Sequence, residues 1–221
     1  MNIYDKYQII KSKRKSMAIN IKPDGSVIIR VPLLASTPTI QKFITKYQSW
    51  INDKLETINA NPPINDQLYY LGQLYPMVLT QKSTNTVEIL ENNILIAIKD
   101  DQDRPHPMLI NWYKQQTISL VTPILKKYQA KYEITFNRLT ITAAKTRWGS
   151  CSSRGNICFS YRLAMLPIYV IEYIVVHELA HLKYLNHSSK FWEHVGKLYP
   201  EYNNAEKWLK QHKYALAQQI I

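Results

Sequence analysis

The sequence is poor in cysteine and in long apolar runs. Cys151 and Cys158 are its two cysteines among 221 residues, so disulfide bonds are not the organising principle of the fold. No stretch of 18 apolar residues occurs, so the sequence implies no transmembrane helix and no membrane partner. Residues 1–7 lack the apolar core of a signal peptide. These absences predict a cytoplasmic protein with reduced thiols.

Acidic residues are also scarce, above all toward the C-terminus. Lys and Arg outnumber Asp and Glu by 28 to 16, which gives a net charge of +12. Residues 1–110 carry a net charge of +3, and the remaining residues carry +9. A basic surface attracts nucleic acid, nucleotides or acidic peptides, or it reflects a lysine-rich composition without a partner. No Asp follows Asp103, which removes aspartate from the candidate metal ligands of the second half.

Against this background, histidine is concentrated in one segment. His177-Glu178-Leu179-Ala180-His181 follows an apolar run that begins after Pro167. Two histidines four residues apart lie on one face of a helix and can reach a single metal ion. Zinc prefers nitrogen ligands, and a catalytic zinc site uses three protein ligands and leaves one position for water. The pattern predicts a Zn²⁺ site in which Glu178 is the base that accepts a proton from water.

The third ligand is less firmly defined by spacing. We favour His187, with Glu201, Glu193 and His194 as alternatives. In metzincins, which have the same spacing between the second and third histidine, a glycine midway permits a sharp turn, but this chain has Tyr184 there. We therefore expect the helix to extend beyond His181 and the chain to turn around residues 185–186.

Hydrophobic periodicity predicts an α+β fold in two parts. Residues 1–104 form an antiparallel β-rich region with a hairpin (17–21 and 27–31), one helix from Pro38, and a strand group up to residue 98. The polar run 99–105 marks the boundary. Residues 105–221 form a zincin-like catalytic domain with a long helix (108–132), a small sheet (138–160) and the HExxH helix. An edge of that sheet can bind an extended substrate above the metal.

At this point the chain resembles the YgjP-like metallopeptidase family, relatives of the SprT-like and WLM zincins. The resemblance is carried by Arg-Trp-Gly-Ser-Cys-Ser at 147–152, Tyr-Arg-Leu at 161–163 and the histidine segment with Asn-His-Ser at 186–188 and Phe-Trp at 191–192. It implies zinc held by His177, His181 and His187, with Glu178 as the catalytic base. Ser160-Tyr161 replaces the family's usual Asn-Trp, so an amide-specific contact there is not expected.

The resemblance leaves the substrate open between a peptide or protein and a nucleotide. Relatives cleave proteins trapped on DNA, whereas YgjP-like proteins are linked to hydrolysis of nucleoside triphosphates, particularly UTP. The leading hypothesis is a zinc metallopeptidase. The alternatives are a nucleoside triphosphate pyrophosphatase with the same metal site, and a nucleic-acid-binding module whose zinc is structural.

Three further residues distinguish these hypotheses. In a nucleotide hydrolase, Arg147 and Arg162 would bind phosphate oxygens and Trp148 would stack on a base. Otherwise Trp148 packs beside the zinc helix and Arg147 makes a structural ion pair. Cys151 is a further conceivable metal ligand, but with Cys158 it more simply forms a pair of small buried side chains in a hairpin.

Overall fold

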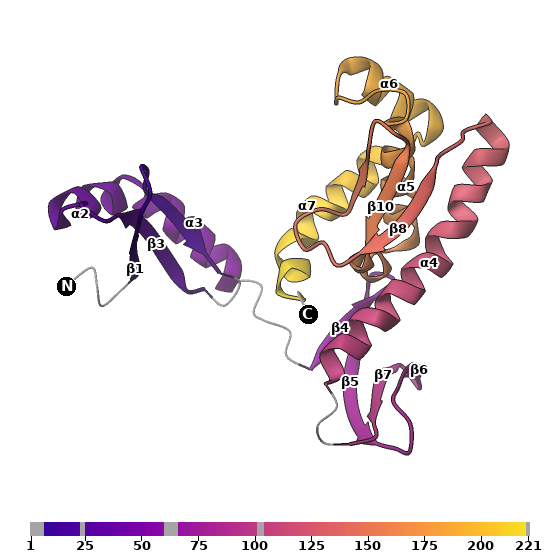
Figure 1. Cartoon of the computed structure of the whole chain (residues 1–221), viewed down its shortest axis with the longest axis horizontal. Coiled ribbons are helices and arrows are strands. Elements are labelled where there is room, and N and C mark those ends of the chain that lie inside the picture. The colour runs from indigo at the N-terminus through magenta and orange to yellow at the C-terminus, as the bar shows by residue number, and fades with distance from the viewer. Residues whose placement is uncertain (1–6, 23–24, 60–65, 101–103, 220–221) are drawn as a thin grey trace. The chain divides into compact units, whose positions relative to one another are not determined.

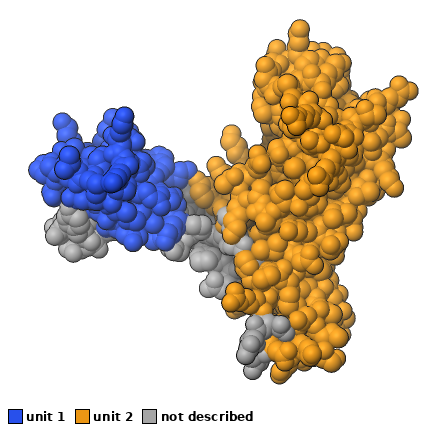
Figure 2. All heavy atoms as spheres, in the orientation of Figure 1, with its two compact units in different colours: residues 1–64 blue, residues 65–221 orange. Residues whose placement is uncertain are grey.

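The computed structural model describes residues 7–22, 25–59, 66–100 and 104–219. Predictions that concern residues 1–6, the hairpin turn at 23–24 and residues 101–103 of the polar run lie outside the described residues. The chain divides into two compact units, residues 1–64 and 65–221 (Figure 2). No described sheet is shared between the units, so the two are described separately.

The first unit contains a three-stranded sheet and two helices (Figure 1). Strands β1 (Gln8–Ser12), β2 (Ala18–Ile21) and β3 (Val27–Pro32) are arranged in the order β1-β3-β2. The pairing of β2 with β3 is antiparallel and confirms the predicted hairpin. The pairing of β1 with β3 is parallel, which the sequence pattern did not indicate.

The expected single helix after Pro38 is divided into α2 (Thr37–Lys46) and α3 (Gln48–Asn59). Tyr47 leaves helical geometry, with φ −106° and ψ 11°, and donates its N–H to Ile44, three residues back. Apolar side chains nevertheless pack against the sheet on both sides of this break. The buried ones are Ile40, Ile44 and Ile51, which pack with Ile29 and Val31.

The second unit begins with a four-stranded sheet in the order β4-β5-β7-β6. Its strands are β4 (Gln67–Tyr70), β5 (Gln73–Gln81), β6 (Thr86–Leu90) and β7 (Asn93–Ile98). Only the β5–β7 pair among them is parallel. Helix α4 (Pro105–Tyr132) follows and contains Pro123.

The boundary expected near residue 104 lies inside this second unit, because β4 is tied to later elements. Leu71 and Gly72 donate their backbone N–H groups to the carbonyls of Ala164 (2.9 Å) and Met165 (3.0 Å). The buried hydroxyl of Tyr113 on α4 also bonds to a β4 carbonyl. These contacts join residues 65–100 to the C-terminal part, and the two compact units divide at 64/65 instead.

A second sheet and four helical elements complete the unit. Strands β8 (Arg138–Thr142), β9 (Gly149–Cys151) and β10 (Asn156–Ser160) have the order β8-β10-β9, which leaves β9 at an edge. The 3₁₀ helix η1 (Tyr161–Met165) leads into α5 (Ile168–Ala180), α6 (Ser189–Leu198) and α7 (Tyr202–Gln218). The α+β class is therefore confirmed. None of the helices described is both long and apolar enough to cross a bilayer.

Candidate metal centre

Helix α5 positions the histidine motif and is buried on nearly all sides. Pro167 precedes its first turn, where the missing N–H and fixed φ of proline suit a helix start. The helix packs against α4, α6, α7 and β9, which accounts for its continuous apolar sequence. Its core side chains are Val170, Ile171, Tyr173, Ile174, Val175, Val176 and Leu179. A buried helix of this kind fixes its last turn, and with it the motif, firmly in the unit.

The structure brings His177, His181 and His187 together. One ring nitrogen of each lies within 4.8 Å of the others. The Nε2 atoms of His177 and His187 are 2.9 Å apart. Three nitrogen ligands of a tetrahedral zinc ion would be separated by about 3.3 Å, given Zn–N bonds near 2.0–2.1 Å. The donor type and the convergence of these rings therefore fit a divalent metal of the zinc kind.

Neighbouring oxygens hold two of the rings in the orientation that a metal needs. Nδ1 of His181 is 2.9 Å from the carbonyl oxygen of Tyr184. Nδ1 of His177 is 3.5 Å from the hydroxyl of Tyr173, which donates its own proton to Glu206 at 2.8 Å. A proton on each Nδ1 leaves Nε2 with a lone pair to offer a metal.

The helix that carries the motif ends earlier than expected. Helix α5 ends at Ala180 and His181 is its C-cap residue, so the expected extension of the helix beyond His181 is wrong, whereas the chain does bend at residues 185 and 186. The N–H groups of Leu182 and Lys183 bond back to the carbonyls of residues 179 and 180, which tightens the end of the helix. Together with the bond from His181 to Tyr184, this turn makes the reversal without a glycine. His187 is thereby brought back to the other two histidines.

The pKa values of two of the histidines are lowered by burial and by their neighbours. Burial lowers the pKa of His177 to about 4, and the neighbouring His181 and His187 add to the effect. Burial and His181 also lower the pKa of His187. Neutral imidazoles are the form that binds metal, so the cluster is ready to bind a cation at neutral pH.

Glu178 lies beside this cluster but faces the sheet. It is only 5% exposed, and burial raises the pKa of its carboxyl to about 7, while Arg147 acts in the opposite direction. Its Oε2 atom is buried without a protein hydrogen-bond partner. A carboxyl with a pKa near 7 can both accept and return a proton at physiological pH.

Gly149 on β9 forms the wall against the Glu178 carboxyl. A Cβ atom at position 149 would lie 2.6 Å from Glu178 Oε1 and 2.9 Å from its Cδ. Real Cβ atoms essentially never approach this closely. The absence of a side chain at Gly149 therefore allows the strand to lie directly on the carboxyl, a constraint that no pattern in the sequence revealed.

Strand β9 leaves one edge open beside Glu178. Ser160 donates its N–H to Trp148 (2.8 Å), and Ser152 donates to Asn156 (3.0 Å), so residues 148 and 152 direct their backbone groups toward β10. In an antiparallel pair these groups alternate in direction along the strand. Gly149 and Cys151 accordingly point their N–H and C=O groups away from β10. No other described strand pairs with that edge.

The residues that sequence reasoning linked to a nucleotide occupy different settings. Arg147 is exposed, and its charge acts on Glu178. Arg162 is 5% exposed and donates to the carbonyls of Lys145 (2.7 Å) and Leu216 (2.6 Å). Its guanidinium lies 4.7 Å from the centre of the Trp148 ring. Arg162 thus fastens the segment before β9 to the end of α7.

The alternative ligands lie outside the histidine cluster. Glu193 makes a 2.6 Å ion pair with Lys197, Glu201 accepts a bond from Asn204, and the ring of His194 packs on Tyr184. Cys151 is free and half-buried, and burial, with Glu178 and Cys158, raises the pKa of its thiol to about 11. A thiol with so high a pKa is a poor metal ligand at neutral pH.

The histidine cluster at the end of α5 and in the loop after it, the buried Glu178 of α5 and the open edge of β9 lie close together in one compact unit. The family model described as "YgjP-like, metallopeptidase domain" matches residues 15–212. The chain therefore belongs to the YgjP-like metallopeptidase family, a family of metal-dependent hydrolases. Neither the curated proteins nor the solved structures contain a significant match.

Proposed function

We propose that this chain is a zinc-dependent metallopeptidase whose metal ligands are His177, His181 and His187. The observation that carries the proposal is the convergence of their ring nitrogens within 4.8 Å. The buried carboxyl of Glu178 follows directly after His177 on the same helix. Family membership supports a hydrolase that depends on a metal. A closed structural zinc site needs four protein ligands, and the cluster found among the described residues has three, which favours a catalytic site over a structural one.

The residues of the chain then have separate tasks. When bound, zinc would supply Lewis acidity and lower the pKa of a water molecule to about 7. Glu178, with its own pKa raised to about 7, accepts the proton from water and passes it to the leaving amine of the peptide. The wall at Gly149 limits the positions that the carboxyl can take.

The open edge of β9 supports a peptide as the substrate. An extended peptide can add to an exposed strand through backbone hydrogen bonds. Gly149 and Cys151 offer the N–H and C=O groups for this pairing, next to Glu178. A substrate paired with this edge would therefore present its own peptide bonds to the catalytic carboxyl.

A nucleoside triphosphate is the principal alternative substrate. It would use the same metal ligands and base, with Arg147, Arg162 and Trp148 as nucleotide contacts. The contacts of Arg162 disfavour this, because its two terminal nitrogens bond to backbone carbonyls and its guanidinium stacks on Trp148. One face of the tryptophan ring is thus already covered, and we propose that Arg162 is structural.

Purified protein loaded with zinc tests the proposal when it is incubated with a mixed peptide library, with casein and with UTP in parallel. We expect new peptide termini in mass spectra, lost in Glu178→Gln although zinc is still bound. Release of pyrophosphate from UTP without any peptide cleavage would replace the peptidase by the nucleotide hydrolase.

A further inference from the structure

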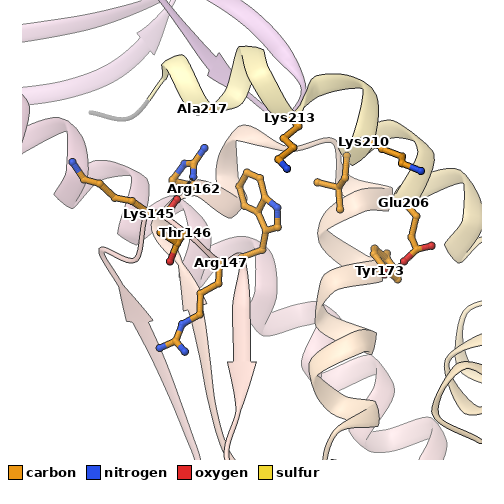
Figure 3. A pocket seen from close by; sticks show the side chains of 11 residues that line it. Lys145, Thr146, Arg147, Arg162, Tyr173, Glu206, Lys210, Lys213 and Ala217 are labelled. Carbon is orange, nitrogen blue, oxygen red and sulfur yellow. Dashed lines mark hydrogen bonds between the residues drawn. The ribbon is translucent and has the colours of Figure 1, made fainter. Parts of the chain in front are cut away.

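A pocket with a volume of about 550 Å³ lies between the segment that precedes β9 and helix α7 (Figure 3). The segment contributes residues 145–148, and α7 contributes the residues that face it. Arg162 and Tyr173 complete the lining. The α7 residues are Glu206, Leu209, Lys210, Lys213 and Ala217.

The lining carries an excess of positive charge, with five basic side chains and one acidic side chain. Arg162 is buried and already bonded to carbonyls. The other four, Lys145, Arg147, Lys210 and Lys213, are exposed and form no ion pair with any residue that the structure describes. Trp148, Leu209 and Ala217 add apolar surface. Unpaired cations around apolar surface favour a ligand that has an anionic group on a short hydrocarbon stem.

The pocket adjoins the candidate metal centre at two points. Tyr173 lines the pocket, and its hydroxyl lies 3.5 Å from the His177 ring. Trp148 also lines it and directly precedes Gly149, the residue that abuts Glu178. A peptide paired with the open edge of β9 would therefore extend beyond Gly149 toward this pocket.

We propose that the pocket binds a carboxylate of the peptide substrate and so gives the enzyme a preference for acidic peptides. This proposal rests on the proposed metallopeptidase function. The carboxylate belongs either to an Asp or Glu side chain or to the C-terminus of the substrate. Lys210 and Lys213 lie one turn apart on α7 and supply mobile point charges from one side. Lys145 and Arg147 add positive charge on the other side, although Figure 3 shows their charged ends turned away from α7. Glu206 in the same wall selects against ligands with several negative charges.

Paired peptides separate the two sources of the carboxylate. One pair differs by Glu or Gln at a single internal position, and a second pair differs by a free or an amidated C-terminus. Binding to the zinc-loaded Glu178→Gln protein is measured by calorimetry, and cleavage by the wild type is measured in parallel. We expect the acidic member of one pair to bind about tenfold more tightly, a preference that declines as salt rises.

Charge removal on α7 tests the residues themselves. In the double variant Lys210→Gln/Lys213→Gln, we expect the acidic-to-neutral ratio of affinities to fall toward one. Lys126→Gln is the matched control, because Lys126 is an exposed lysine on α4 outside the pocket. It should keep the full preference.

The possible failures are distinguishable. If the wild type cleaves acidic and neutral peptides equally, or if the double variant keeps the preference, the carboxylate pocket is wrong and the peptidase stands. If no peptide is cleaved while UTP is hydrolysed, the proposed function fails and the carboxylate pocket fails with it.

Discussion

The two sides of the candidate site acquire their geometry by different means. On the helix side, residues 177–187, local rules suffice, because the spacing of four places His177 and His181 on one face of α5 and a tight turn returns His187. On the strand side, residues 145–151, no local rule places the chain. Arg162, far along the sequence, holds this segment to the end of α7, and packing on α5 sets the position of β9.

This difference implies that metal binding and placement of the base are separable. The proposed ligands depend on one helix and the turn after it. The environment of Glu178 depends instead on Gly149 of strand β9, which packs directly against the carboxyl. Loss of a histidine on the helix side should abolish zinc binding and activity together, whereas changes on the strand side should impair activity and leave zinc in place.

The largest effect is expected from removal of a ligand on the helix side. In His187→Ala, two histidines remain, and we expect zinc affinity to fall by at least about 100-fold, with hydrolytic activity lost in parallel. Competition with a chromophoric chelator measures the affinity. His194→Ala is the control, since His194 packs on Tyr184 outside the cluster and its loss should leave zinc bound. Full zinc affinity in His187→Ala would reassign the third ligand.

On the strand side, Gly149→Ala should lower catalytic activity without lowering zinc affinity. The new Cβ would lie 2.6 Å from Glu178 Oε1 and would displace the carboxyl. We expect kcat to fall by about 100-fold and the free energy of unfolding to fall by about 2 kcal/mol. Zinc affinity should remain at the wild-type value.

Two further variants show whether the contact between the new Cβ and the Glu178 carboxyl causes the loss of activity and stability. Gly196→Ala on α6 meets no atom closer than 3.5 Å and should be neutral or slightly stabilising. Gly149→Ala/Glu178→Asp shortens the displaced side chain, so it should recover part of the lost stability without recovering activity. Wild-type kcat in Gly149→Ala would show that the wall does not position the base.

Sequence alone predicted that His177, His181 and His187 would lie together, which the structure shows, and the roles given to them and to Glu178 stay predictions. Spacing identified His177, Glu178 and His181, and the resemblance to a family supported His187 over Glu193 and Glu201. The expected extension of the helix beyond His181 was wrong, because the end of the helix is tightened and His181 bonds to the carbonyl of Tyr184. Tyr173 could have been recognised as a partner of His177 from its position one turn earlier on the same face.

The strand side could not be predicted, because its contacts join residues distant in the chain. Arg162 bonds to Leu216, 54 positions later, and nothing in the local pattern indicates this. The pocket depends on the packing of α7 against the segment before β9. The division of the chain into units at 64/65 was not predicted for the same reason, since the bonds from Leu71 and Gly72 to η1 join residues far apart in the sequence.

Glu178 belongs to both sides, and its burial predicts a pH dependence in the metal-free protein. Its pKa in the folded state, about 7, lies above the ordinary value of 4.5. The folded state therefore binds this proton more tightly, and stability is lost as pH rises from about 4.5 through 7. Because one pKa unit corresponds to about 1.4 kcal/mol, the loss amounts to about 3 kcal/mol by pH 8.

Glu178→Gln isolates this contribution from that of the histidines. His177, with its pKa lowered to about 4, acts in the opposite direction, so stability is lost as pH falls from 6.5. The histidine contribution is shared by wild type and variant and cancels in their difference. We expect metal-free Glu178→Gln to be more stable than the wild type at pH 8 and about equal to it at pH 4, as measured by urea unfolding. A difference independent of pH would contradict the raised pKa.

The smallest effect is expected at Arg162, which holds the segment before β9 to the end of α7. Two different nitrogens of Arg162 bond to the carbonyls of Lys145 and Leu216, and Arg162→Lys leaves a single nitrogen for both, so we expect one buried oxygen to lose its partner. We expect a loss of about 2 kcal/mol in the free energy of unfolding. Zinc affinity should be unchanged, because the helix side does not depend on this contact. An increase in KM without any loss of stability would instead show that Arg162 binds the substrate, and the strand side would then be held by other contacts.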